Sequence, residues 1–350
     1  MDIGVGLDAT LGLSLEQQGE LSQEAASLGY TSIWTPESTG MDSFQLCSQR
    51  WNASRSVVSE GIDTGIAVSP VMYRSPLAFA MSGGTLSHLT GGKFTLGIGT
   101  GGAYRPRSRQ AIGMPKISAL SLMRDYLVTV QDLVRGKEVN YEGEVVTLKG
   151  MQLGINPAPN TPVYLGTLGP AMLKLAGELA DGVCLNWCNP EQIAWSRDRI
   201  AEGAALVSRD PSEIKMVEYI RVCVDEDEEL ARLAFAKSTM GYALGQTVPT
   251  QRERQLGYRA HFERMGFGEE LADLDQMRRE GATTDEVAEA FPAEVLKKVG
   301  YYGKPEGAGE AFYNLAKGLD TALVRVVSAK PGVDSVLATM RACQPANRSE

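Results

Sequence analysis

The stretch Gly91-Gly92-Lys93-Phe94-Thr95-Leu96-Gly97-Ile98-Gly99-Thr100-Gly101-Gly102 decides the fold. Residues 94–98 predict a short buried strand, and the glycines that follow it allow the backbone to turn sharply. Because these glycines have no side chains, a flat or anionic group can approach the main chain closely. In chains that alternate strands and helices, ligands bind at the carboxyl ends of such strands. The stretch therefore predicts a strand that leads directly into a binding site.

The same strand signal recurs along the chain, with helical patterns between the strands. The eight predicted strands cover residues 3–7, 30–34, 64–71, 94–98, 162–166, 182–187, 215–224 and 322–328. Between the first two, Ser14 and Gly29 are suitable start and stop residues for a helix, which predicts a right-handed crossover. Eight such alternations predict an α/β fold, a (β/α)8 TIM barrel that forms a single domain over residues 1–350.

Two segments depart from this alternation. Residues 139–148 predict a hairpin with Glu142-Gly143 at its turn. Residues from about 245 to 295 are charged, rich in arginine and helical in parts, with no clear strand. We expect this second segment to be a helical insertion in the C-terminal half that covers the site or forms an interface.

Composition narrows the function classes. The 350-residue chain has a formal net charge of −9 and no block of lysine and arginine, so nucleic acid and membranes are not expected as partners. No leader or apolar run of spanning length is present, and the five cysteines form no tight framework. These features predict a cytoplasmic protein with reduced thiols. No histidine or cysteine group has the spacing of a metal site.

Few residues offer acid–base chemistry. Glu37 follows Pro36 at the end of the second predicted strand, where barrel sites lie, although a solvated loop acid explains it equally well. The histidines are His88 and His261, and neither suggests a catalytic triad. Three arginines in the segment 105–109 either hold an anion or are solvated. The shortage of such machinery indicates that a cofactor carries the difficult step.

A second motif predicts where an anion binds. Gly169-Pro170 opens a helix after the strand 162–166, and the free N–H groups of its first turn attract anions. An ordinary βα loop is the alternative. Together with the glycine turns, this motif suits a flavin-like ring with a phosphorylated tail.

The residues quoted so far resemble the signature of the bacterial luciferase-like superfamily. The resemblance is carried by residues 91–101, by Leu168-Gly169-Pro170 with residues 175–182, and by the block from Val71 to Pro76 that includes Arg74. It spans most of residues 1–240 and resumes near 303–328. The turn 99–101 and Gly169-Pro170 favour the branch that uses the deazaflavin coenzyme F420, with FMN as the alternative.

The resemblance implies a TIM-type barrel with an insertion, usually a homodimer, with the cofactor ring at the carboxyl ends of the strands. It also implies a cis peptide within residues 66–68, in a bulge of the third strand behind the ring. The implied catalytic residues are Glu37 and Tyr104, and the implied substrate residues are Ser38, Asn186 and Trp187. The implied cofactor residues are Glu37, Ala67, Val68, Ser69, Thr100, Gly101, Arg105, Gly166, Thr167, Leu168, Gly169, Pro170 and Met172.

The sequence departs from the superfamily's sugar-phosphate dehydrogenases. Ser38 stands where they have a catalytic histidine, and Gly102 stands where they have a glutamate. Their substrate-phosphate lysine is missing near Asn186 and Trp187. These departures argue against glucose-6-phosphate oxidation by that mechanism. The missing histidine also departs from luciferase-type FMN monooxygenases.

The sequence therefore predicts an F420-dependent oxidoreductase that transfers a hydride between C5 of the deazaflavin and a small organic substrate. An imine or activated C=C bond is a suitable substrate. Two alternatives stay open, namely a two-component FMN-dependent monooxygenase and a non-catalytic flavin-binding protein.

Overall fold

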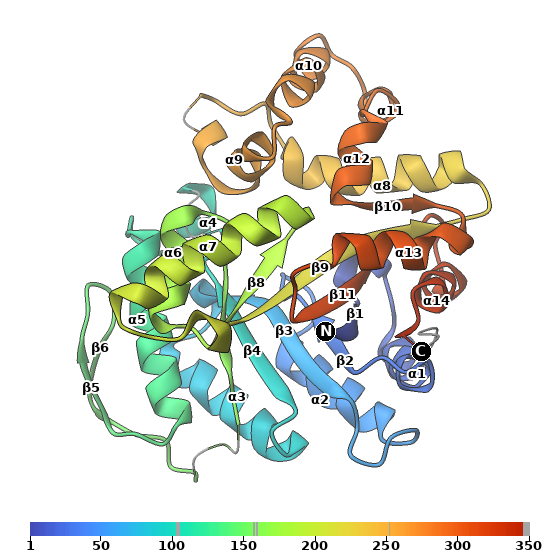
Figure 1. Cartoon of the computed structure of the whole chain (residues 1–350). Coiled ribbons are helices and arrows are strands. Elements are labelled where there is room, and N and C mark those ends of the chain that lie inside the picture. Colours follow the sequence, from blue (N-terminus) through green and yellow to red (C-terminus); the bar gives the residue numbers. More distant parts are fainter. Residues whose placement is uncertain (103–105, 157, 159, 252, 346–350) are drawn as a thin grey trace.

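The chain folds as a closed barrel of eight parallel strands, which confirms the predicted TIM barrel. The computed structural model describes residues 1–102, 106–156, 158, 160–251 and 253–345 (Figure 1). Around the barrel the strands pair in the order β1-β2-β3-β4-β7-β8-β9-β11, and β11 pairs back with β1. Their bounds are β1 Asp2–Gly6, β2 Ser32–Thr35, β3 Asp63–Pro70, β4 Phe94–Gly99, β7 Val163–Gly166, β8 Gly182–Asn186, β9 Lys215–Val224 and β11 Thr321–Val326.

The strand β9 has ten residues and is longer than one neighbour can cover. Along one edge its first half pairs with β8, from Gly182–Lys215 to Asn186–Tyr219. Its second half pairs with the short strand β10 (Gly300–Gly303), from Gly300–Arg221 to Gly303–Val224. β10 lies just after the segment from about 245 to 295 and is not among the eight predicted strands. β10 continues the line of β8 along β9, just beyond the barrel wall.

Helices cover the outside of the barrel, as their apolar faces require. Ser14 caps α1 with a reciprocal capping box, which confirms its predicted role. Asp42 caps α2 through the backbone N–H of Gln45. The barrel helices are α1 Leu15–Ser27, α2 Ser43–Ser54, α3 Pro76–Thr90, α5 Ala119–Val134, α6 Pro170–Leu179, α7 Pro190–Leu206, α8 Glu228–Ala243, α13 Pro305–Leu315 and α14 Val333–Ala342. The short helix α4, Pro106–Ala111, lies between β4 and α5 in the sequence.

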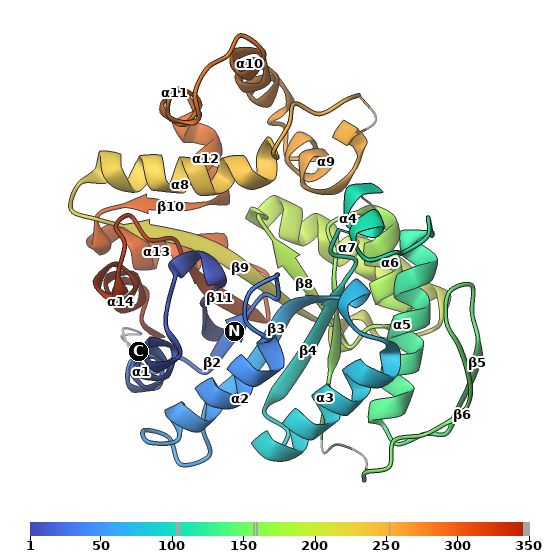
Figure 2. The same ribbon diagram turned by 180° about the vertical axis from the view of Figure 1, so that it is seen from behind.

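The predicted hairpin and insertion are both present. The hairpin consists of β5 (Val139–Glu142) and β6 (Thr147–Met151), which pair antiparallel beside α5 (Figure 1). The insertion is helical, as expected: α9 Gly257–Arg264, α10 Gly268–Arg279, α11 Thr284–Glu289 and α12 Ala293–Val299. With α8 these helices form a layer over one end of the barrel in both views (Figures 1 and 2). Their apolar core is separate from the main one, and it includes Trp187 from the end of β8.

Other expectations bear on the rest of the molecule. All five cysteines are buried and free. None of the described helices combines the length and apolar character that a bilayer crossing requires. The helix α3 exposes Met81 and Leu89, two apolar side chains that a partner subunit could cover. The homodimer itself stays a prediction.

Candidate active site

The strand β3 carries a bulge at its carboxyl end. Its register with β4 shifts between Ile66 and Ser69, and the peptide bond between Ala67 and Val68 is cis. Both features confirm the expectation for residues 66–68. The backbone N–H of Glu37 donates a hydrogen bond to the carbonyl of Val68 at 3.1 Å. The loop after β2 therefore holds the bulge directly.

The glycines of the neighbouring strands make room for this bulge. A Cβ atom added at Gly99 would lie 2.7 Å from a methyl carbon of Val68, and one added at Gly166 would lie 2.9 Å from the other. At Gly97 a Cβ would lie 2.2 Å from the carbonyl oxygen of Ile66. For Gly99, the interpretation that the glycines after the strand admit a ligand therefore needs correction, because the bulge fills its space. Gly101 differs, since its φ of +53° is a left-handed conformation that favours glycine.

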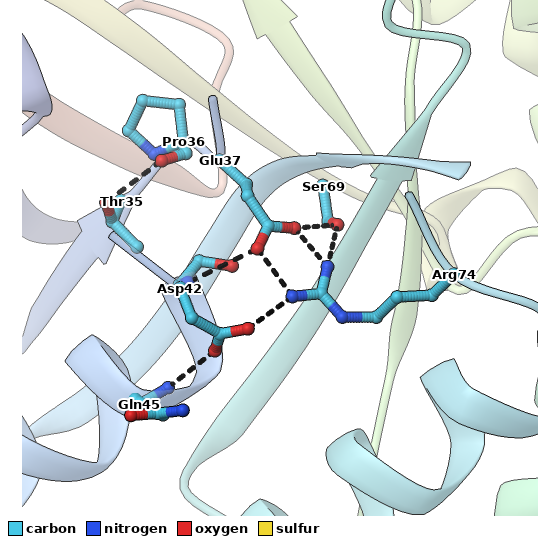
Figure 3. Close-up of polar contacts among 8 residues, drawn as sticks. Thr35, Pro36, Glu37, Asp42, Gln45, Ser69 and Arg74 are labelled. Carbon is cyan, nitrogen blue, oxygen red and sulfur yellow. Dashed lines mark hydrogen bonds and ion pairs between the residues drawn. The ribbon is translucent and has the colours of Figure 1, made fainter. Parts of the chain in front are cut away.

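Glu37 is buried and ion-paired at the mouth of the barrel (Figure 3). The guanidinium of Arg74 donates to both of its carboxylate oxygens, with Nη2 at 2.7 Å from Oε1. The Oγ of Ser69 donates to Oε2, and the backbone N–H of Ser43 donates to Oε1 at 3.3 Å. The solvated-acid alternative is therefore wrong. Every oxygen of this carboxylate already has a donor, which suits a positioning role.

Arg74 is the centre of this network. Its Nη2, which donates to Glu37, also binds Asp42. Its guanidinium carbon lies 4.9 Å from the centre of the Phe44 ring. The hydroxyl of Tyr126 donates to the carbonyl of Arg74 at 3.0 Å. The residue lies in the quoted block 71–76, but sequence reasoning gave it no role. A signal existed, because a lone arginine before Ser75-Pro76 at the end of a strand requires an acidic partner if it is buried.

The loop after β7 leads into the uncapped start of α6. Gly169 is the N-cap residue with φ −94° and no side-chain hydrogen bond, and Pro170 occupies the first turn. A Cβ added at Gly169 would meet nothing within 4 Å. The buried hydroxyl of Thr167 has no hydrogen-bond partner in the described part of the chain. The first-turn N–H groups of α6 therefore have no side-chain cap, and the Thr167 hydroxyl has no acceptor among the described residues. Gly166, Leu168 and the half-buried Met172 lie next to these donors in the chain.

Across the mouth, the end of β8 meets the second half of β9 and the insertion. The amide of Asn186 accepts from Arg221 at 2.6 Å and donates to the hydroxyl of Tyr258 at 2.7 Å. The guanidinium carbon of Arg221 lies 3.7 Å from the centre of the Trp187 ring. Trp187 is fully buried, whereas Ser38 is exposed. Sequence reasoning missed Arg221 and Tyr258, although inward alternation along β9 is a signal for Arg221.

A buried polar cluster lies behind Trp187. His261 contacts the carbonyl of Trp187 through Nε2 at 2.8 Å, and burial lowers the pKa of this imidazole to about 4. The backbone N–H of Cys188 donates to Oε1 of Glu218 at 2.5 Å, whereas Oε2 of Glu218 has no partner among the described residues. Burial raises the pKa of Glu218 to about 8. The cluster joins the insertion to the barrel.

Glu218 should make the stability of the protein depend on pH. Its pKa in the folded state exceeds the ordinary value of 4.5, so its contribution is full below pH 4.5 and is lost as the pH rises toward 8. Glu218→Gln resembles the protonated form and should remove this loss. We expect the stability advantage of the variant over the wild type to grow by about 2–4 kcal/mol between pH 5 and pH 8.

Thermal melting of both proteins across this range checks the prediction. Glu144→Gln, in the exposed hairpin turn, is the control and should change the melting temperature little at any pH. A difference between Glu218→Gln and the wild type that does not vary with pH would contradict the expectation.

Two predicted site residues, Tyr104 and Arg105, lie outside the described residues. Thr100 is half-buried beside Gly101 at the end of β4. Within the described ranges, no three histidine, cysteine or acidic side chains are grouped to hold a metal ion. The structure thus brings Glu37, residues 67–69 and residues 166–170 together at one end of the barrel. Asn186 lies at the same end, across the mouth from Glu37.

Comparison with known proteins agrees with this arrangement. The model of the luciferase-like monooxygenase family matches residues 2–321. A 5,10-methylenetetrahydromethanopterin reductase of Archaeoglobus fulgidus is 33% identical over 193 residues, which cover 55% of this chain and 57% of that protein. An F420-dependent glucose-6-phosphate dehydrogenase of Mycobacterium avium is 30% identical over 168 residues, covering 47% and 50%. The chain thus spans about half the length of the curated relatives it matches.

A solved structure extends the likeness to the whole fold. The coenzyme F420-dependent tetrahydromethanopterin reductase of Methanopyrus kandleri superposes with a TM-score of 0.74, at 19% identity, over 98% of this chain and 97% of that one. At this identity the likeness concerns the fold. Because the family model covers most of the sequence, the chain belongs to the luciferase-like monooxygenase family, in which its relatives include F420-dependent oxidoreductases.

Proposed function

We propose that this protein is an F420-dependent oxidoreductase that transfers a hydride between C5 of the deazaflavin and a small organic substrate, such as an imine or activated C=C bond. The observation that carries the proposal is the contact between the β3 bulge and the loop at residues 166–170, where Val68 fills the space above Gly166. We call this loop the phosphate loop. The names of the relatives support F420 as the cofactor.

The loop at residues 166–170 fits the phosphate of such a cofactor. The first turn of α6 has no side-chain cap, and the open space at Gly169 leaves its N–H groups accessible to an anion. The hydroxyl of Thr167 has no partner among the described residues and is a further donor for a phosphate oxygen. Burying this hydroxyl without an acceptor costs free energy, which binding of the phosphate would recover.

The bulge fits the ring. The cofactor, when bound, supplies the carbon that gives or accepts the hydride. Ala67, Val68 and Ser69 would lie behind it, and Glu37 would hold their backbone in place through Val68 and Ser69. Asn186 and Ser38 would face the substrate. Tyr104 stays the proposed proton donor, because both oxygens of Glu37 are engaged by Arg74.

Two residues argue against the sugar phosphate that the mycobacterial relative oxidises. Ser38 and Gly102 replace the histidine and glutamate that the resemblance implies for that reaction. The missing histidine and glutamate favour a substrate that needs no base to remove a hydroxyl proton. An activated C=C bond accepts a hydride and then one proton, which Tyr104 or solvent would supply.

Titration of the purified protein with F420 and with FMN, followed by fluorescence quenching, tests the proposal. F420 should bind with a dissociation constant in the low-micromolar range or tighter, which corresponds to a binding free energy of about −8 kcal/mol. FMN should bind more weakly. Reduced F420 should then be consumed with members of a panel of imines and enoates. A clear preference for FMN would instead favour the monooxygenase, and F420 binding without turnover on any substrate would favour a non-catalytic role.

A further inference from the structure

A cavity of about 510 Å³ lies beside the loop at residues 166–170, between the start of α7 and the end of α9. It is lined by Asn189, Glu191, Gln192, Trp195, Arg264 and Met265. Both views of the ribbon place α9 next to α7 (Figures 1 and 2). None of the roles described so far uses this cavity.

Gln192 lines the cavity and has an unused hydrogen-bond donor. Only 7% of the residue is exposed, and its Nε2 has no partner in the described part of the protein. Its backbone N–H is already satisfied by Oδ1 of Asn189 at 2.8 Å. Buried amides without a partner are rare, because the lost hydration costs about 1–3 kcal/mol. The amide thus indicates a missing acceptor.

Arg264 supplies positive charge and connects the cavity to the loop. Its Nη2 donates to the carbonyl of Leu168 at 2.7 Å, one residue before Gly169. Its guanidinium carbon lies 5.5 Å from the centre of the Trp195 ring. No ion pair to an acidic side chain is recorded for Arg264 among the described residues. A guanidinium beside amide donors suits a carboxylate, which accepts from both.

The helix α7 adds to this preference. It has 17 residues and begins at Pro190, so its positive dipole end faces the cavity from the side of Asn189 and Gln192. Glu191 opposes an anion, but its side chain is exposed at the rim, where solvent weakens its effect. The charges inside the cavity are therefore complementary to an anion, and the rim reduces the preference.

We propose that this cavity binds a carboxylate of the cofactor's tail, in the part that continues beyond the phosphate. The inference rests on the proposed function, because F420 carries glutamate residues on that side of its phosphate. The phosphate at Gly169 would direct the tail past Leu168, toward Arg264 and Gln192. The affinity of the protein for F420 should then depend on the length of the tail.

The test compares long-tailed F420 with F420 that ends at the phospholactyl group, in binding titrations. The wild type should bind the long-tailed form about five- to tenfold more tightly, a gain that salt reduces. Gln192→Leu should lose most of this gain and keep the affinity for the short form. Its melting temperature should not fall, because the change removes an unpaired donor.

Glu191→Gln is the matched variant on the same turn of α7. It removes the opposing charge at the rim and should strengthen binding of the long-tailed form by about twofold, with no effect on the short form. Opposite signs at neighbouring positions separate a carboxylate site from general damage to the helix.

Four outcomes would overturn the proposal. Equal affinity of the wild type for both forms would show that the tail does not bind, while the proposed function would stand. Loss of both forms in Gln192→Leu would assign the residue to the phosphate loop instead. Competition by a carboxylated substrate against the short form, without a preference for tail length, would assign the cavity to the substrate. Failure of both forms to bind the wild type would overturn the proposed function as well.

Discussion

Gly169→Asp is expected to abolish F420 binding and to leave the fold intact. The added side chain meets no atom within 4 Å, and the extended φ of −94° suits any residue. Aspartate is also a good N-cap, so the helix α6 should gain a few tenths of a kcal/mol. The new carboxylate would, however, occupy the place of the phosphate. Like charges about 4 Å apart cost about 4 kcal/mol near a protein surface, which weakens binding about a thousandfold.

Gly169→Asn is the matched control, because asparagine has the same size and caps helices equally well but carries no charge. It should weaken binding much less than aspartate does. Fluorescence titration measures affinity and thermal melting reports the fold. If both variants bind F420 as well as the wild type, the start of α6 is not the phosphate site.

Glu37→Gln is expected to weaken cofactor binding at least tenfold while turnover at saturating cofactor stays within a few-fold. The amide would turn a donor toward one of the two nitrogens of Arg74 that now donate to Glu37. Ser69 would lose its charged acceptor, and the bulge that Glu37 supports would be less well held. Breaking this nearly buried ion pair should also lower the free energy of unfolding by about 2–3 kcal/mol.

Asp42→Asn is the control that distinguishes loss of support for the bulge from loss of an ion pair to Arg74. Asp42 binds the same guanidinium, yet it makes no recorded contact with residues 67–69. Asparagine preserves its cap on α2. We expect cofactor affinity close to that of the wild type. A roughly hundredfold loss of turnover in Glu37→Gln, with affinity unchanged, would instead indicate that Glu37 transfers a proton.

The barrel was predictable because its signals are local. Buried parallel strands read as short apolar runs, and β9 was predicted with its observed bounds, Lys215–Val224. The N-cap at Ser14 depends on residues three positions apart. The cis bond came from the resemblance and not from residue chemistry, since the residues 66–68 contain no proline.

What the sequence did not reveal depends on distant contacts. The strand β10 reads Gly-Tyr-Tyr-Gly, which resembles a turn in sequence. The reason for its first glycine is a distant contact, because Phe235, 65 positions earlier in the chain, fills the space above Gly300. Arg74, Arg221 and Arg264 look like surface arginines until their partners Glu37, Asn186 and Leu168 are placed. The same applies to Gln192, whose burial follows from how α7 and α9 pack.

The divided edge of β9 has a consequence for how such proteins diversify. Residues between α8 and β10 leave and rejoin the molecule beside one strand, and they have an apolar core of their own. Lengthening or replacing that stretch would leave the ladder that closes the barrel unchanged, and loop length itself costs little free energy. Yet Tyr258 and Arg264 come from this stretch and reach the mouth and the loop. Changes in this stretch can therefore alter the groups that line the mouth while the strand pairing that closes the barrel stays the same.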